Sequence, residues 1–147
     1  MASHIKLVIN KAPQPQPRPR VTVRGRYVHA YENKQITMYK RMVAAVYKSK
    51  FKTIKPTDKA LAVNVIFYRP IQNAISKIER KRRLTGESLP VVKPDIDNYV
   101  KAILDALNGV AFKDDSQIIA LNAKKLYSDK PRTEMEIQEI EESHSND

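Results

Sequence analysis

The chain has 147 residues, with 27 Lys and Arg against 16 Asp and Glu, and its formal charge is +11. This length suits one domain with its own hydrophobic core. The absence of cysteine excludes disulfides, thiolate metal sites and cysteine nucleophiles. Three glycines are too few for a Gly-rich phosphate loop or a dinucleotide fingerprint. The apolar runs are too short to span a bilayer and no signal segment opens the chain, so we expect a soluble, cytoplasmic protein without a membrane partner.

The first third of the chain alternates extended and helical patterns. Residues 4–10 alternate apolar and polar side chains and predict a strand. The prolines of Pro13–Arg20 predict an extended loop that exposes Arg18 and Arg20. Residues 21–30 predict a hairpin that turns near Gly25. A long helix is predicted over residues 33–51, with an apolar face made of Ile36, Tyr39, Val43, Val46 and Tyr47.

The rest of the chain continues this pattern. A strand is predicted over residues 60–68, a short basic helix within 72–85 and a loop over 86–94. A second long helix over 95–108 ends at Asn108–Gly109 and has an inward face made of Ile96, Val100, Ile103, Leu104 and Leu107. Two further strands are predicted over 117–127 and 133–140. We therefore expect a single α+β domain over residues 1–140, with a small mixed sheet and two main helices packed against it, followed by an acidic, frayed tail at 141–147.

The charge is distributed unevenly along the chain. Residues 1–94 carry a net charge of +17, and residues 95–147 carry −6. A basic body of this size favours a polyanionic partner, because neutralising phosphates releases counterions. A basic surface that serves only solubility and an acidic membrane target are the alternatives.

Five aspartates fall within 21 residues of this basic chain, namely Asp95, Asp97, Asp105, Asp114 and Asp115. Two carboxylates that lie two residues apart at a helix entrance can converge on one point, and hard cations such as Mg²⁺ prefer such oxygen ligands. Crowded aspartates repel one another unless a cation lies among them. A bound metal can activate water and stabilise charge on a phosphate, and Lys101, one turn after Asp97, is placed to contact the same phosphate.

Each of these residues also has a purely structural interpretation. Asp95 is suited to cap the helix N-terminus. Asp97, Lys101 and Asp105 have the spacing of a surface ion-pair ladder. Asp114 and Asp115 are common turn residues before a strand.

Taken together, the segment Lys93–Gly109 and the D-D-S-Q motif that follows at residues 114–117 resemble the RusA family of Holliday junction resolvases. The order DxDN, Lys, D-A-L and D-D-x-Q is specific to this family. Weaker similarity covers Pro13–Arg20 and Tyr31–Tyr39. The resemblance implies a small homodimeric, Mg²⁺-dependent endonuclease of bacterial or phage origin, of a kind common in prophages.

The resemblance also implies roles for individual residues. Asp95, Asp97 and Asp115 match the three catalytic, metal-binding aspartates, and Lys101 matches the catalytic lysine. Asn98, Asp105 and Asp114 match motif positions of secondary importance, where Asp105 would orient Lys101. The implied cofactor is Mg²⁺, with Mn²⁺ as an alternative.

The expected function is therefore paired phosphodiester hydrolysis in branched DNA, above all four-way junctions, during recombination and repair. A two-fold dimer suits a junction of approximate two-fold symmetry. Phosphates would be held by basic residues of two segments: Arg18, Arg20, Arg24 and Arg26, and Lys77, Arg80, Lys81, Arg82 and Arg83. Tyr27, Tyr31 and Phe112 would stack on bases, unless they lie in the core.

Two other classes of function remain open from the sequence. A non-catalytic basic nucleic-acid-binding module explains the charge and leaves the aspartates as caps and ion pairs. A Mg²⁺-dependent nucleotidyl or sugar-phosphate transferase explains the DxD motif, but not the charge of residues 1–94.

Overall fold

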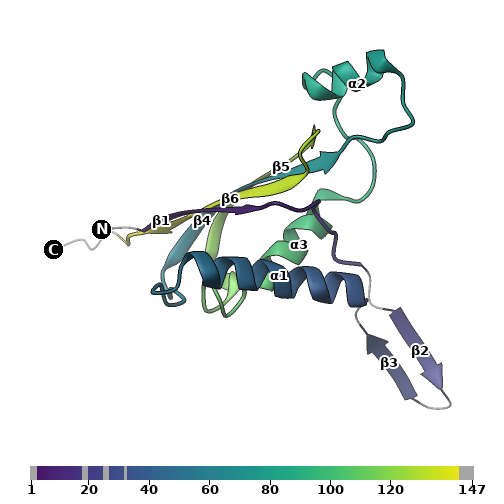
Figure 1. The fold of residues 1–147 in the computed structure, drawn as a ribbon. Coiled ribbons are helices and arrows are strands. Elements are labelled where there is room, and N and C mark those ends of the chain that lie inside the picture. Colours follow the sequence, from purple (N-terminus) through teal and green to yellow (C-terminus); the bar gives the residue numbers. More distant parts are fainter. Residues whose placement is uncertain (1–2, 18–19, 25–26, 32, 143–147) are drawn as a thin grey trace.

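A four-stranded mixed sheet forms the centre of the molecule (Figure 1). The computed structural model describes residues 3–17, 20–24, 27–31 and 33–142, and only the backbone of 20–24 and 27–31. The strand order is β1 (His4–Ile9), β6 (Arg132–Ile140), β4 (Ala60–Pro70) and β5 (Ile118–Ser128). β6 is antiparallel to β1 and β4, whereas β5 is parallel to β4. The predicted α+β class with a mixed sheet is confirmed.

A separate hairpin projects from this body (Figure 1). Its strands are β2 (Arg20–Arg24) and β3 (Tyr27–Tyr31), which pair antiparallel with Arg20 opposite Tyr31. The predicted hairpin is therefore confirmed, although the turn at Gly25 lies outside the described residues.

The two long helices, α1 (Lys34–Lys50) and α3 (Ile96–Leu107), cover the same face of the sheet (Figure 1). α1 begins after Asn33, whose side chain accepts a hydrogen bond from the backbone N–H of Gln35 at 2.8 Å. Such a bond satisfies one of the free donors of the first turn. The predicted apolar face of α1 is buried against the sheet, with Val46 at its margin.

The buried face of α3 agrees with the prediction at Ile103 and Leu107 and differs from it elsewhere. Its buried residues are Tyr99, Ala102, Ile103, Ala106 and Leu107, whereas Ile96, Val100 and Leu104 are only partly buried. The reason is that α3 packs against both the sheet and α1. Small alanines at the contact let neighbouring elements approach closely. The ring of Tyr99 stacks on Phe67 of β4 with centroids 5.1 Å apart.

Phe112 belongs to the core. Its side chain has no solvent-exposed area, and its backbone forms bridges to Thr57 and Asn108. Of the two alternatives given for Phe112, the core position is therefore confirmed, and base stacking is wrong. Gly109, which ends α3 as predicted, has a φ of 78°, a conformation that side-chain-bearing residues rarely adopt.

The short helix α2 (Lys77–Leu84) lies beside β5, away from the other two helices (Figure 1). It lies within the predicted range 72–85 and begins after Ser76, which caps it by accepting a hydrogen bond from the backbone N–H of Glu79 at 3.1 Å. The guanidinium of Arg83 lies 4.6 Å from the ring centroid of Tyr127 and attaches α2 to β5. Within the described ranges, no helix has the length and apolar character needed to cross a membrane.

Candidate active site

The N-terminal end of α3 presents two aspartates to solvent. Asp95 occupies the N-cap position with extended backbone, and Asp97 lies in the first turn. Unlike Asn33 and Ser76, Asp95 makes no capping hydrogen bond with its side chain. Asp95 is thus the N-cap residue, as its structural interpretation predicted, but among the described residues its side chain makes no capping bond, and its exposed carboxylate is left available for a ligand.

Lys101 is exposed one turn after Asp97, as predicted. Among the residues that the structure describes, neither side chain forms an ion pair. Asp105 does not complete a ladder with them, because its carboxylate lies 3.5 Å from the Nζ of Lys40 on α1. The ion-pair ladder is thus not formed, and the predicted orienting partner of Lys101 is bound elsewhere.

The loop over residues 11–17 runs beside this helix end. The backbone N–H of Gln16 donates to the carbonyl of Asn98 at 2.9 Å. This bond joins the proline-rich segment to the DxDN motif through the backbone of Asn98, whose side chain is partly buried. This contact joins residues that lie far apart in the sequence, so it was not predicted. It brings the residues just before Arg18 next to the acidic motif.

A second lysine also lies at this end of α3. Lys125 of β5 donates from Nζ to the carbonyls of Val92 at 2.6 Å and Pro94 at 2.9 Å. Burial and the nearby guanidinium of Arg69 lower the pKa of Lys125, and the carboxylate of Asp95 opposes this shift. Lys125 is not among the predicted site residues. Its register with the buried Phe67 is known only from the strand pairing, so no local pattern in the sequence marks it.

The Asp114–Asp115 turn precedes β5. The carboxylate of Asp114 accepts hydrogen bonds from the hydroxyl and the backbone N–H of Ser116. The hydroxyl bond is the main cause that lowers the pKa of Asp114. Asp114 thus acts as a turn residue, as its structural interpretation predicted. Asp115, which begins the short 3₁₀ helix η1 (Asp115–Gln117), is exposed.

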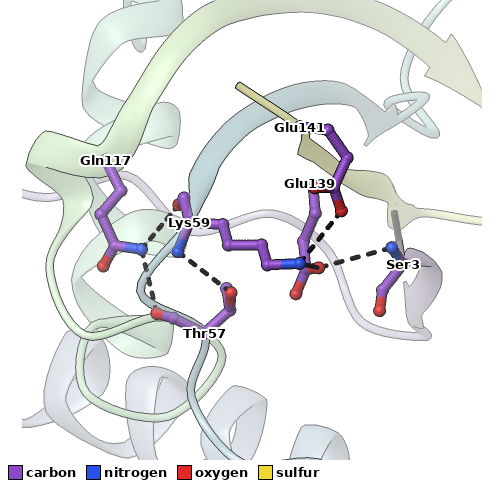
Figure 2. A network of polar contacts seen from close by, with 6 residues as sticks. All are labelled: Ser3, Thr57, Lys59, Gln117, Glu139 and Glu141. Carbon is purple, nitrogen blue, oxygen red and sulfur yellow. Dashed lines mark hydrogen bonds and ion pairs between the residues drawn. The ribbon is translucent and has the colours of Figure 1, made fainter. Parts of the chain in front are cut away.

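Gln117 holds this turn against the segment before β4 (Figure 2). Its Nε2 donates to the carbonyls of Thr57 at 2.9 Å and Lys59 at 2.8 Å. Its Oε1 accepts from the backbone N–H of Asp114 at 2.8 Å. The final Gln of the D-D-x-Q motif therefore fixes where Asp115 lies.

Lys59 extends this network toward the last strand (Figure 2). Its Nζ lies 3.0 Å from Glu141 and 3.7 Å from Glu139. Glu139 in turn accepts a hydrogen bond from the backbone N–H of Ser3 at 3.4 Å. The start of the predicted acidic tail is thus in contact with the domain at Glu141, while residues 143–147 lie outside the described residues.

The predicted metal ligands occupy two places. Asp95 and Asp97 lie at the N-terminal end of α3, whereas the turn with Asp115 follows its C-terminal end. The twelve residues of α3 span about 18 Å, at 1.5 Å per residue. In the described part of the chain, no three His, Cys, Asp or Glu side chains are grouped so that they could hold one metal ion. A single chain therefore does not bring the three aspartates together.

The predicted DNA-binding residues differ in how they are presented. Arg18 and Arg26 lie outside the described residues, and the side chains of Arg20 and Arg24 are not described. Of the predicted DNA-binding residues on α2, Lys77, Lys81 and Arg82 are exposed, whereas Arg80 and Arg83 are partly buried.

Several cations of α2 have partners. The guanidinium of Arg83 lies 3.1 Å from Glu79, and that of Arg82 lies 3.5 Å from Glu79 and 3.7 Å from Glu87. Lys77 and Lys81 form no ion pair with any residue the structure describes. Of the α2 cations, these two are the best placed to contact phosphates.

The fold and the site define a basic α+β domain with exposed carboxylates at both ends of one helix. The family model described as Endodeoxyribonuclease RusA matches residues 11–138. The chain belongs to the RusA family of endodeoxyribonucleases, as the resemblance in its motifs predicted. The matched range contains every residue proposed above for metal, catalysis or DNA.

Two relatives are similar to this chain. An uncharacterized protein, YqaN, from Bacillus subtilis (strain 168) is 36% identical over 138 residues, which cover 92% of this chain and 96% of that protein. A protein named crossover junction endodeoxyribonuclease rusA, from Lactococcus phage r1t, is 43% identical over 49 residues. The latter similarity covers 33% of this chain and 37% of the phage protein.

Proposed function

We propose that this protein is a Mg²⁺-dependent endonuclease that resolves four-way DNA junctions in recombination and repair. One observation carries the proposal: in a member of an endodeoxyribonuclease family, Asp95 and Asp97 lie exposed at a helix start, and their side chains form no capping bond or ion pair with the residues that the structure describes. The similarity to the phage crossover junction endodeoxyribonuclease supports the choice of substrate.

The donors at this site suit a hard cation. Carboxylate oxygens are the preferred protein ligands of Mg²⁺, and Mn²⁺ accepts the same ligands. Asp95, Asp97 and Asp115 would hold the ion, which when bound would activate water and stabilise charge on the scissile phosphate.

The proposed reaction is hydrolysis of one phosphodiester bond in each of two strands. A water oxygen forms a bond to phosphorus, and the bond between phosphorus and the 3′-oxygen breaks. The ammonium of Lys101 stabilises the negative charge that develops on the phosphate oxygens. The 3′-oxygen leaves with a proton as a hydroxyl group, and the phosphate remains on the 5′ end of the downstream fragment.

The proposed active unit is a homodimer whose sites are shared between chains. Within one chain, α3 separates Asp95 and Asp97 from Asp115 by its own length. A second copy, related by two-fold symmetry, would place its Asp115 beside the first copy's Asp95 and Asp97, and the reverse. Two equivalent sites would then face two strands of the junction.

The basic segments are proposed to bind the DNA arms. Lys77 and Lys81 on α2 would hold phosphates without reading base sequence. Arg18, Arg20, Arg24 and Arg26 would do the same from the loop and hairpin that follow the segment attached to Asn98.

The first test compares cleavage of a synthetic four-way junction and a matched linear duplex, with Mg²⁺ or with EDTA. Wild type should make symmetric nicks in the junction alone, and only with metal, while Asp97→Asn should make none. Glu136→Gln, which changes a carboxylate on the uncovered face of the sheet, should cleave like wild type. Tight junction binding without cleavage in any metal would refute the nuclease and leave a binding module.

The second test addresses the shared site. Asp97→Asn and Asp115→Asn chains, co-expressed with different tags and purified as the mixed pair, should regain nicking in one strand of the junction. In the mixed pair one site has both substitutions and the other has neither. If both pure variants and the mixed pair are inactive, each site lies within one chain and the shared arrangement is wrong.

A further inference from the structure

Lys125 contacts the chain segment that leads into the acidic motif. It lies on β5 opposite Phe67 of β4, a fully buried core residue. Because side chains alternate along a strand, Lys125 points to the same face as Phe67, which the helices cover. The neighbouring Lys124 pairs with Ile66, lies on the other face and is exposed.

The ammonium of Lys125 is used for structural contacts. It donates to the carbonyls of Val92 and Pro94, the latter directly before Asp95. A hydrogen bond from a charged donor is shorter and stronger than one from a neutral donor, and the distances of 2.6 and 2.9 Å agree with this. Lys125 therefore connects an edge strand of the sheet to the residues that precede α3.

The bonds from Lys125 take the place of a side-chain capping bond, which Asp95 does not form with the described residues. Most N-cap side chains bond to the first turn of their helix and so fix both themselves and the chain before it. The side chain of Asp95 makes no such bond. The backbone before it is held by Lys125, and the carboxylate stays available for a ligand.

We infer that Lys125 is a positioning residue for Asp95, and that it keeps this carboxylate in place for binding Mg²⁺. The inference rests on the proposed function. In the described residues the hydrogen bonds of Lys125 go to the two carbonyls, so its proposed role is to position Asp95 and not to contact substrate or metal. It acts by holding the segment from Val92 to Asp95 against β5. Residues that orient metal ligands affect metal affinity by about 10–100-fold when they are lost.

The test compares Lys125→Met, Lys125→Arg and the matched control Lys124→Met. Methionine keeps the unbranched stem and removes the donors, while arginine keeps the charge and the donors. Three quantities are measured: the Mg²⁺ concentration at half-maximal junction cleavage, junction affinity in EDTA, and hydrogen–deuterium exchange of residues 92–98 without metal.

Lys125→Met should raise the half-maximal Mg²⁺ concentration by about tenfold and accelerate exchange in residues 92–98. Its junction affinity in EDTA should change by less than about twofold. Lys125→Arg should restore most of the Mg²⁺ dependence, and Lys124→Met should match wild type in its Mg²⁺ dependence and exchange.

Two results would overturn this role for Lys125. One is unchanged exchange and Mg²⁺ dependence in Lys125→Met. The other is a large loss of junction affinity in EDTA, which would make Lys125 a DNA contact. If wild type cleaves no junction in any metal, the proposed function fails. In that case the positioning role of Lys125 is tested by two other comparisons between wild type and Lys125→Met. These are the hydrogen–deuterium exchange of residues 92–98 and the rise in melting temperature that Mg²⁺ causes.

Discussion

Replacing Gln117 by alanine tests whether its side chain holds the Asp114–Asp115 turn. The change removes two donated hydrogen bonds, to Thr57 and Lys59, and one accepted from Asp114. Each such bond contributes about 0.5–1.5 kcal/mol net, and water can reach the exposed groups once Gln117 is gone. We therefore expect a loss of about 2 kcal/mol in the free energy of unfolding. In a protein of this size, that corresponds to a fall of about 4–8 °C in melting temperature.

The assay is thermal unfolding followed by circular dichroism, with two comparison variants. Gln138→Ala removes an exposed glutamine on β6, so its melting temperature should stay close to that of wild type. Gln117→Glu keeps size and shape but turns a carboxylate toward two carbonyls. It should be strongly destabilised at neutral pH and partly recover in acid, where a protonated Glu donates again. If Gln117→Ala melts like Gln138→Ala, the turn is held by other contacts and the interpretation of the motif's last residue is wrong.

Three further outcomes follow from the site and its charges. Millimolar Mg²⁺ should raise the melting temperature of wild type, and Asp97→Asn should reduce that rise; differential scanning fluorimetry that finds no rise in either protein would contradict a metal site. Junction affinity should fall steeply with salt, and replacing Lys77 and Lys81 together by alanine should lower the log–log slope by about two; an unchanged slope would exclude α2 from the interface. Lys59 lowers the pKa of Glu141, so the NMR titration midpoint of that carboxyl should rise in Lys59→Met. The stabilisation from this pair is present above the ordinary pKa of Glu and is lost as pH falls through the lowered one, and an unchanged midpoint would mean that the ion pair is absent in solution.

Local signals in the sequence predicted most of the fold. Asn33 and Gly109 mark helix ends by bonds or backbone conformations that involve only their neighbours, so they were identified correctly. Contacts between distant residues were not predictable in the same way. Lys125 reaches Pro94 across 31 positions, and Lys40 reaches Asp105 across 65. Such pairs depend on which elements the tertiary fold brings together.

The buried face of α3 was misjudged for a related reason. Periodicity favoured its large aliphatic residues, of which Ile103 and Leu107 are buried, but the helix also buries Tyr99 and two alanines. A helix that contacts both a sheet and another helix needs small residues where the elements approach most closely. This requirement is set by the position of α1 and cannot be deduced from the sequence of α3 alone.

The spacing of the aspartates in the folded chain was also not predictable from the sequence. It changes the repulsion that is expected between them. Five aspartates within 21 residues suggested mutual repulsion that a cation relieves. α3, about 18 Å long, instead separates the helix start, with Asp95 and Asp97, from the turn with Asp115, and this length is well beyond the ~8 Å screening length at physiological salt. In one folded chain, repulsion between the two groups is therefore weak. Under the proposed shared site, it arises when two copies meet, and a cation bound there would relieve it. Metal binding and dimer formation are then thermodynamically linked, because an ion held by both chains stabilises the dimer over the separate chains.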